Sequence, residues 1–168
     1  QAEVEMVTLD GTAAGKVDLG GIGTAAGFGG DASSPETFYS FSGFTTPSVI
    51  YRLDTATGER TVFAKPDLPF NPDDYVTEQR FYTSKDGTKI PLFLVYRKDL
   101  DLTKGHPTML YGYGGFNISL TPSYSATRMA WLEAGGVYAQ AGLRGGGEYG
   151  KAWHDGGRLL NKQNVFDD

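Results

Sequence analysis

A stretch rich in proline and aspartate near the middle of the chain limits what the 168 residues can fold into. Residues 66–74 hold three prolines and three aspartates in nine positions. Proline lacks a backbone N–H donor and fixes φ, so this stretch suits neither a helix nor a central strand. We therefore expect a linker at residues 71–76 between a first domain of residues 1–70 and a second domain of residues 77–168.

The first part of the chain has the pattern of short strands separated by turn residues. Strands are favoured at Val4–Leu9, Thr37–Phe44, Ser48–Leu53 and Arg60–Phe63. The last two flank Asp54–Gly58, which has the length and the glycine of a hairpin loop. This succession predicts antiparallel all-β structure, and it does not distinguish a sandwich, a barrel or a propeller blade. We interpret the Gly20–Gly30 stretch as a loop.

The second part combines strands with a helix. Strands are predicted at Glu78–Ser84, Lys89–Tyr96, Thr108–Tyr113 and Val137–Ala141. The first two flank a turn at Lys85–Thr88, and the last is apolar enough to be buried on both faces. Residues 123–134 suit a helix, with Ser123 as its N-cap and Gly135 at its C-terminal end. A hairpin followed by strand, helix and strand is typical of a mixed α/β sheet.

Composition excludes several classes of function. The chain has no cysteine, so disulfides, thiolate metal sites and a cysteine nucleophile are ruled out. Its 15 basic residues are scattered and outnumbered by 20 acidic ones, which argues against nucleic acid as a partner. No apolar run approaches the ~18 residues of a membrane span, and the two histidines lack metal-ligand spacing. We therefore expect no metal, no cofactor, no nucleic acid and no membrane partner.

Glycine accounts for 24 residues, and three clusters of it raise the question of a ligand site. In Gly21–Gly27 the third glycine stands one place too late for a dinucleotide loop, and no helix can follow it. Tyr111–Phe116 and Arg144–Gly150 each follow a strand, where ligand sites of open α/β sheets gather. Tyr113 offers a phenol donor there and Phe116 an apolar wall, with packing of aromatic side chains around turns as the alternative.

A catalytic centre is not visible in the residues alone. Arg144 and Glu148 are four residues apart and could pair, which favours a structural interpretation of the third glycine cluster. His106 precedes a proline and His154 lies beside a predicted helix start, and neither has the neighbours that a triad base requires. No serine stands in Gly-x-Ser-x-Gly, the turn that exposes the nucleophile of an α/β-hydrolase.

Several motifs of the second part, taken together, resemble the prolyl oligopeptidase family of serine peptidases. In chain order they are Ser84–Pro91, Leu110–Ser119, Arg144–Gly150 with Trp153–His154, and Lys162–Asp168. The resemblance is strong over residues 78–168 and looser over residues 1–76. It implies a mixed fold, in which the C-terminal strands of a β-propeller are followed by the opening β-strands and helix of an incomplete α/β-hydrolase domain.

The resemblance also implies roles for two residues and a class of substrate. The second tyrosine of the Tyr-Gly-Tyr-Gly-Gly-Phe motif, Tyr113, corresponds to the tyrosine that donates its hydroxyl to the family's oxyanion hole. Phe116, which closes the motif, corresponds to the wall of the pocket for the proline ring. Such enzymes hydrolyse short peptides after proline through a serine ester, so short proline-containing peptides are the implied partners of a monomeric enzyme. Both cytoplasm and periplasm stay open as its location.

In the family, the catalytic serine, aspartate and histidine lie downstream of the motif that ends at Asp168. We therefore expect a piece of a longer enzyme that is inactive alone, with no nucleophile, base or orienting acid. Alternatives are an oligopeptidase B-like enzyme that cuts after Arg or Lys, a non-catalytic peptide-binding relative, and a free-standing small β/α binding domain. Phe116 favours proline, since an apolar wall suits a pyrrolidine ring better than a cation.

Overall fold

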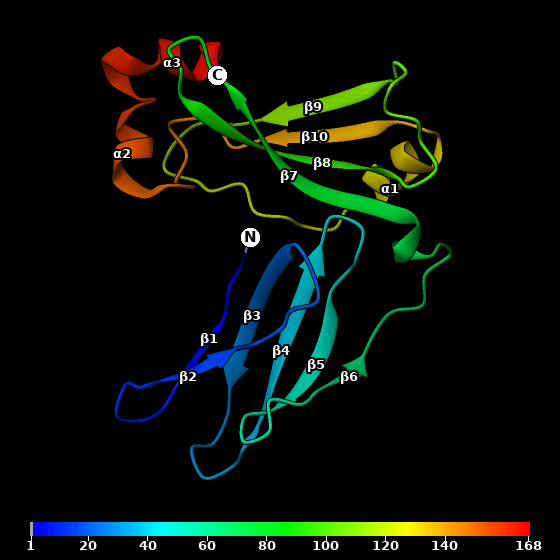
Figure 1. Ribbon diagram of the computed structural model, residues 1–168, viewed down its shortest axis with the longest axis vertical. Helices are drawn as coiled ribbons and strands as arrows, with labels where there is room; N and C mark the ends of the chain where they lie inside the picture. Colours follow the sequence, from blue (N-terminus) through cyan, green and yellow to red (C-terminus); the bar gives the residue numbers. More distant parts are fainter. Residues whose placement is uncertain (1) are drawn as a thin grey trace. The chain divides into compact units, whose positions relative to one another are not determined.

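The structure is a computed structural model that describes residues 2–168 (Figure 1). It divides into two units, which we describe separately. The first contains the chain up to Pro72 together with Thr121–Ser125, and the second contains Asp73–Leu120 and Ala126–Asp168. Among the described residues, every helix is too short or too polar to cross a membrane.

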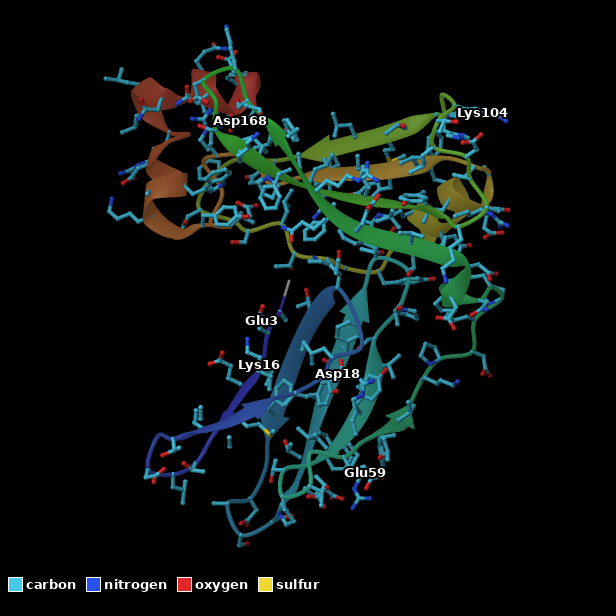
Figure 2. The ribbon with its side chains drawn as sticks, viewed as in Figure 1. Glu3, Lys16, Asp18, Glu59, Lys104 and Asp168 are labelled. Carbon is cyan, nitrogen blue, oxygen red and sulfur yellow. The ribbon has the colours of Figure 1, made fainter. Side chains whose placement is uncertain are left out.

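The first unit holds two antiparallel sheets. The smaller one pairs β1 (Glu5–Val7) with β2 (Ala13–Lys16). Figure 2 shows Glu3 and Lys16 at this hairpin, where the two charged groups lie 2.8 Å apart. The larger sheet consists, in spatial order, of β3 (Gly23–Gly29), β4 (Glu36–Gly43), β5 (Val49–Asp54) and β6 (Arg60–Ala64).

Burial alternates along β4, as it should in a strand that presents one face to a core. The buried cluster of this unit consists of Val17, Leu19, Tyr39, Phe41 and Leu53. The rings of Tyr39 and Phe28 stack within it, with centroids 4.6 Å apart. The strands predicted in this half are therefore present, with ends displaced by at most two residues.

The interpretation of Gly20–Gly30 as a loop is wrong, because residues 23–29 form strand β3. The glycines of this stretch make room for the aromatic residues of β4. A Cβ at Gly23 would lie 2.3 Å from the Phe41 ring, and one at Gly27 would lie 2.9 Å from the Phe38 carbonyl oxygen. Glycine here marks the close approach of a neighbouring strand, which is its other common use in sheets.

The second unit is a four-stranded mixed sheet with the order β7-β8-β10-β9. Its strands are β7 (Tyr75–Thr83), β8 (Lys89–Arg97), β9 (Thr108–Gly112) and β10 (Val137–Ala141). Strands β9 and β10 are parallel, whereas the other pairs are antiparallel. All five residues of β10 are buried, as predicted, whereas β9 is an exposed edge strand. The linker was expected to extend to residue 76, and β7 begins at Tyr75.

Three α-helices and two short 3₁₀ turns complete the second half. They are α1 (Ala126–Glu133), α2 (Gly150–Asp155), α3 (Gln163–Asp167), η1 (Pro72–Asp74) and η2 (Leu159–Asn161). Helix α1 contributes Met129 and Leu132 to the buried residues of the sheet unit, alongside Ile90 and Val95. Figure 1 shows α1 near one end of the sheet and α2 with α3 near the other, where β9 and β10 end.

Helix α1 begins later than predicted, so Ser123 is not its N-cap. Residues 121–125 belong to the first unit, where the Thr24 hydroxyl donates a hydrogen bond to the Pro122 carbonyl at 2.8 Å. Residues 121–125 have no regular secondary structure. The other end is as predicted, since Gly135 follows the helix with φ +85°.

The packing of Gly23 gives a stability prediction with a matched control in the same strand. Gly23→Ala forces a methyl group against Phe41 and the Ser42 carbonyl, and we expect it to lower the free energy of unfolding by about 1–3 kcal/mol. Gly29→Ala meets no atom within 4 Å and should change it little. Denaturant unfolding of the two variants is the measurement. Equal losses would mean that the close approach to Phe41 is unimportant.

Candidate active site

Two loops follow the parallel strands and meet at one edge of the sheet. Because β9 and β10 run in the same direction, their C-terminal ends lie together. We call residues 113–120 the β9 loop and residues 142–149 the β10 loop. Such an edge is where open α/β sheets commonly bind ligands. The two loops contain both residues singled out in the sequence, Tyr113 and Phe116.

Tyr113 and Phe116 both present their side chains to solvent. Tyr113 directly follows β9 and is 42% exposed, and Phe116 is 84% exposed. Phe116 has a φ of +51° and Asn117 has a φ of +57°, so two consecutive side-chain-bearing residues are left-handed. Each such residue costs of order 1–3 kcal/mol, so the surrounding structure must hold the pair in place. An exposed aromatic ring on a strained backbone is a candidate for binding rather than for packing.

The glycines of the β10 loop let it lie directly against the backbone of the β9 loop. A Cβ at Gly145 would lie 2.6 Å from the carbonyl oxygen of Gly114. A Cβ at Gly147 would lie 2.5 Å from the carbonyl oxygen of Asn117. No side chain could replace these hydrogens without moving one loop away from the other. The glycine cluster in the β10 loop therefore allows the two loop backbones to pack in direct contact.

Two hydrogen bonds join the loops, one at the second residue of the strained pair and one three residues after it. The backbone N–H of Asn117 donates to the Gly145 carbonyl at 3.1 Å. The backbone N–H of Leu120 donates to Oε1 of Glu148 at 2.9 Å. Both donors are backbone N–H groups, but the acceptor is a backbone carbonyl in the first bond and a side-chain carboxylate in the second. Sequence reasoning missed the role of Glu148, because no local pattern shows which amide a loop carboxylate will reach.

Arg144 fixes the β10 loop to the rest of the sheet unit. Its guanidinium is buried and lies 2.6 Å from Oδ2 of Asp86 and 2.5 Å from Oδ1 of Asp168. The Ser84 hydroxyl also donates to Asp168, at 2.7 Å, and the carboxylate of Asp168 is fully buried. Figure 2 labels Asp168 beside α3. These contacts join the β10 loop, the β7–β8 turn and the segment after α3.

Arg144 does not form the ion pair with Glu148 that the sequence spacing allowed, because its guanidinium binds Asp86 and Asp168. Residues four apart face each other only on a helix, and the residues between these two form turns. A buried arginine needs carboxylate partners, and here they come from distant parts of the chain. The sequence does not show that Asp86 and Asp168 are the carboxylate partners of Arg144.

Hydrogen bonds between Arg144 and its two carboxylate partners favour the charged form of all three groups. Hydrogen bonds to Asp168 and Asp86 raise the pKa of Arg144 above its ordinary value, against the opposing effect of burial. The hydrogen bond from Arg144 holds the pKa of Asp86 well below its usual range. Burial acts to raise the pKa of Asp168, but hydrogen bonds from Arg144 and Ser84 outweigh it and lower that pKa. All three groups are therefore charged at neutral pH.

Both histidines bind backbone carbonyl groups. Nε2 of His106 lies 2.8 Å from the Asp101 carbonyl oxygen, and Nδ1 of His154 lies 2.8 Å from that of Gly145. Nζ of Lys162 donates to the Gly114 carbonyl at 2.9 Å. These contacts give His154 and Lys162 a part in holding the two loops. Within residues 2–168, no group of His, Asp and Glu side chains is arranged to hold a metal ion.

The fold and the site define the class of protein: propeller-type antiparallel strands followed by the first strands and helix of an α/β-hydrolase sheet. The family described as "Prolyl oligopeptidase, N-terminal beta-propeller domain" matches residues 1–66. The one described as "Prolyl oligopeptidase family" matches residues 122–168. The chain belongs to the prolyl oligopeptidase family, as the sequence motifs predicted. The mixed fold expected from the resemblance is confirmed as well.

Individual relatives match almost the whole chain. A prolyl endopeptidase of Elizabethkingia meningoseptica is 47% identical over 99% of the chain. A solved structure from a study of two prolyl endopeptidases is 52% identical over 98% of it, with a TM-score of 0.87. Prolyl oligopeptidase B of Galerina marginata, solved with a 35mer hydrolysis and macrocyclization substrate, is 33% identical over 98%, with a TM-score of 0.87. The chain spans about a quarter, 24%, of the length of each.

The Arg144 cluster generates a stability prediction. Arg144→Met leaves the buried carboxylate of Asp168 without its cationic partner, and we expect a loss of about 3–5 kcal/mol in the free energy of unfolding. Arg158→Met is the matched control, because Arg158 pairs with Asp155 at the surface, where such pairs contribute about 0–1 kcal/mol. Denaturant unfolding at pH 7 compares the two. A loss at Arg144 no larger than at Arg158 would contradict the anchoring role.

Acid should reduce the difference in the free energy of unfolding between the parent protein and the Arg144→Met variant. The pKa of Asp168 is lowered in the folded state, so its contribution is complete above the ordinary aspartate value of about 3.9. It is lost as pH falls through the folded-state pKa, because the unfolded state then binds more protons. Without Arg144 the buried carboxylate favours its neutral form instead. The stability gap between parent and Arg144→Met should therefore narrow below about pH 4.

Proposed function

We propose that the chain is part of a serine peptidase that hydrolyses short peptides on the carboxyl side of proline. The observation that carries this proposal is the pair of exposed aromatic side chains, Tyr113 and Phe116, at the C-terminal end of β9. Membership of the family supports the reaction class. The peptide-bound structure of the Galerina relative supports peptides as the substrate class.

Tyr113 is proposed as a donor to the oxyanion hole. When a serine hydroxyl attacks a peptide carbonyl, negative charge develops on the carbonyl oxygen in the tetrahedral intermediate. A phenol donor fixed at that point stabilises the charge more than it stabilises the neutral carbonyl. Tyr113 suits this task because it directly follows a strand and is 42% exposed to solvent.

Phe116 is proposed as the wall of the pocket that receives the proline ring. Its ring is almost fully exposed, so a substrate can bury apolar area against it. A pyrrolidine ring gains from that contact, whereas a lysine or arginine side chain would lose hydration without a carboxylate in return. The nucleophile, base and orienting acid would come from residues outside this chain, since it contains no Gly-x-Ser-x-Gly.

A reporter assay tests the substrate class. We expect the full-length enzyme that contains this chain to cleave a blocked Gly-Pro reporter at least ten times faster than the matching Gly-Arg reporter, with inhibition by a serine-directed inhibitor. The 168 residues alone are the control and should show no inhibitor-sensitive cleavage. A preference for arginine would indicate an oligopeptidase B-like enzyme. No cleavage with retained peptide binding would indicate a non-catalytic relative.

Replacing Tyr113 by phenylalanine tests the oxyanion role. The change removes one hydroxyl and keeps the ring, so we expect kcat to fall by about 10²–10³ while KM changes little. Steady-state kinetics on the Gly-Pro reporter separates the two constants. Tyr111→Phe is a matched control, because Tyr111 lies within β9 and has no proposed contact with substrate. An unchanged kcat in Tyr113→Phe would remove this tyrosine from the oxyanion hole.

A further inference from the structure

The strained pair Phe116–Asn117 lies in a loop that is attached at both of its ends. On the near side, the Asn117 N–H donates to the Gly145 carbonyl, and the Ile118 N–H closes a turn onto the Gly115 carbonyl at 3.0 Å. These are backbone contacts that no side-chain substitution removes directly. The far end of the loop, at Leu120, is different, because side chains hold it.

The peptide groups of Leu120 are held from both sides. Its N–H donates to Oε1 of Glu148 at 2.9 Å, and its carbonyl accepts a hydrogen bond from Nε2 of Gln140 at 3.4 Å. Gln140 is buried in β10 and cannot move independently of the sheet. Glu148 lies in the β10 loop, which Arg144 fixes to the rest of the unit. The end of the β9 loop is thereby tied to two rigid supports.

The backbone around Glu148 leaves room for its side chain in this one position. A Cβ at Gly146 would lie 2.1 Å from Oε2 of Glu148, and a Cβ at Gly142 would lie 3.3 Å from its Cγ. Oε2 is buried and has no hydrogen-bond partner within residues 2–168. Burying a carboxylate oxygen without a donor costs stability, so Glu148 is a poor choice for packing alone. What it gains in this position is the bond to the Leu120 amide.

We propose that Glu148 is a positioning residue that holds the Phe116 wall of the substrate pocket through the backbone of Leu120. The inference rests on the proposed function, since it concerns the pocket that Phe116 would line. Without the Glu148 carboxylate, the far end of the β9 loop keeps only the longer bond from Gln140 to the Leu120 carbonyl, so the left-handed pair can relax toward ordinary backbone angles. The ring of Phe116 then leaves the position in which it meets the proline side chain.

The kinetic consequence follows from what Phe116 contacts. An apolar wall binds the ground state and the transition state alike, so its displacement raises KM and leaves kcat nearly unchanged. We expect Glu148→Ala to raise KM for the Gly-Pro reporter about tenfold, the effect of losing one hydrogen bond to a charged group. Glu148→Gln keeps an acceptor oxygen for the Leu120 amide and should restore KM to within about twofold of the parent.

A double-mutant cycle in the full-length enzyme tests whether Glu148 acts through Phe116. Phe116→Ala removes the wall itself, so in that background Glu148→Ala should add less than about twofold to KM. Glu59→Ala is the control for loss of an exposed glutamate in the same chain and should leave both constants unchanged. Thermal melts show whether each variant is folded. If Glu148→Ala does not fold, Glu148→Asp replaces it, because the aspartate side chain is one methylene shorter.

Several outcomes would overturn the proposal. Multiplicative effects of Glu148→Ala and Phe116→Ala would show that the glutamate acts independently of the wall. A fall in kcat with constant KM, or a failure of Glu148→Gln to restore KM, would assign Glu148 another role. The parent enzyme is assayed in parallel, so its inability to cleave the Gly-Pro reporter would refute the proposed function itself. An active parent with an unaltered KM in the Glu148 variants would refute the positioning role alone.

Discussion

The candidate site depends on one packing constraint, the direct contact of two loop backbones at the edge of a parallel strand pair. Side-chain-bearing residues cannot make this contact, because a Cβ at Gly145 or Gly147 would overlap a carbonyl oxygen of the facing loop. The fit leaves the β9 loop no room to relax on that side. The β10 loop therefore fixes the backbone of the β9 loop, which carries the exposed aromatic side chains.

The ion pairs of Arg144 hold the β10 loop itself in place. The β10 loop could not support its neighbour if it were itself mobile, and Arg144 prevents this by joining it to the β7–β8 turn and to Asp168. The three groups lie far apart in the sequence, so the cluster forms only when the sheet unit is assembled. The support of the candidate site is thus coupled to the folding of the whole unit, rather than to the local preferences of either loop.

The sequence predicts the strands of both halves because their apolar and β-branched residues follow a local pattern, and Val137–Ala141 even shows its burial on both faces. Local pattern fails where partners are distant. Gly23 is indistinguishable from a loop glycine until Phe41 is placed opposite it, and Ser123 resembles an N-cap until Pro122 is bound by Thr24. The roles proposed for Tyr113 and Phe116 rest on the resemblance of the motifs. The contacts of Asp86, Asp168 and Glu148 are seen only in three dimensions, because no sequence spacing reveals them.

The left-handed backbone at Phe116 limits which residues could replace it in the proposed pocket wall. A residue with φ near +50° cannot readily be valine, isoleucine or threonine, because a branched Cβ clashes with its own backbone there. The set of side chains open to this position is therefore narrower than the open space around it suggests. If Phe116 lines the substrate pocket as proposed, engineering of substrate preference there is confined to side chains without a branched Cβ, unless the turn is rebuilt first.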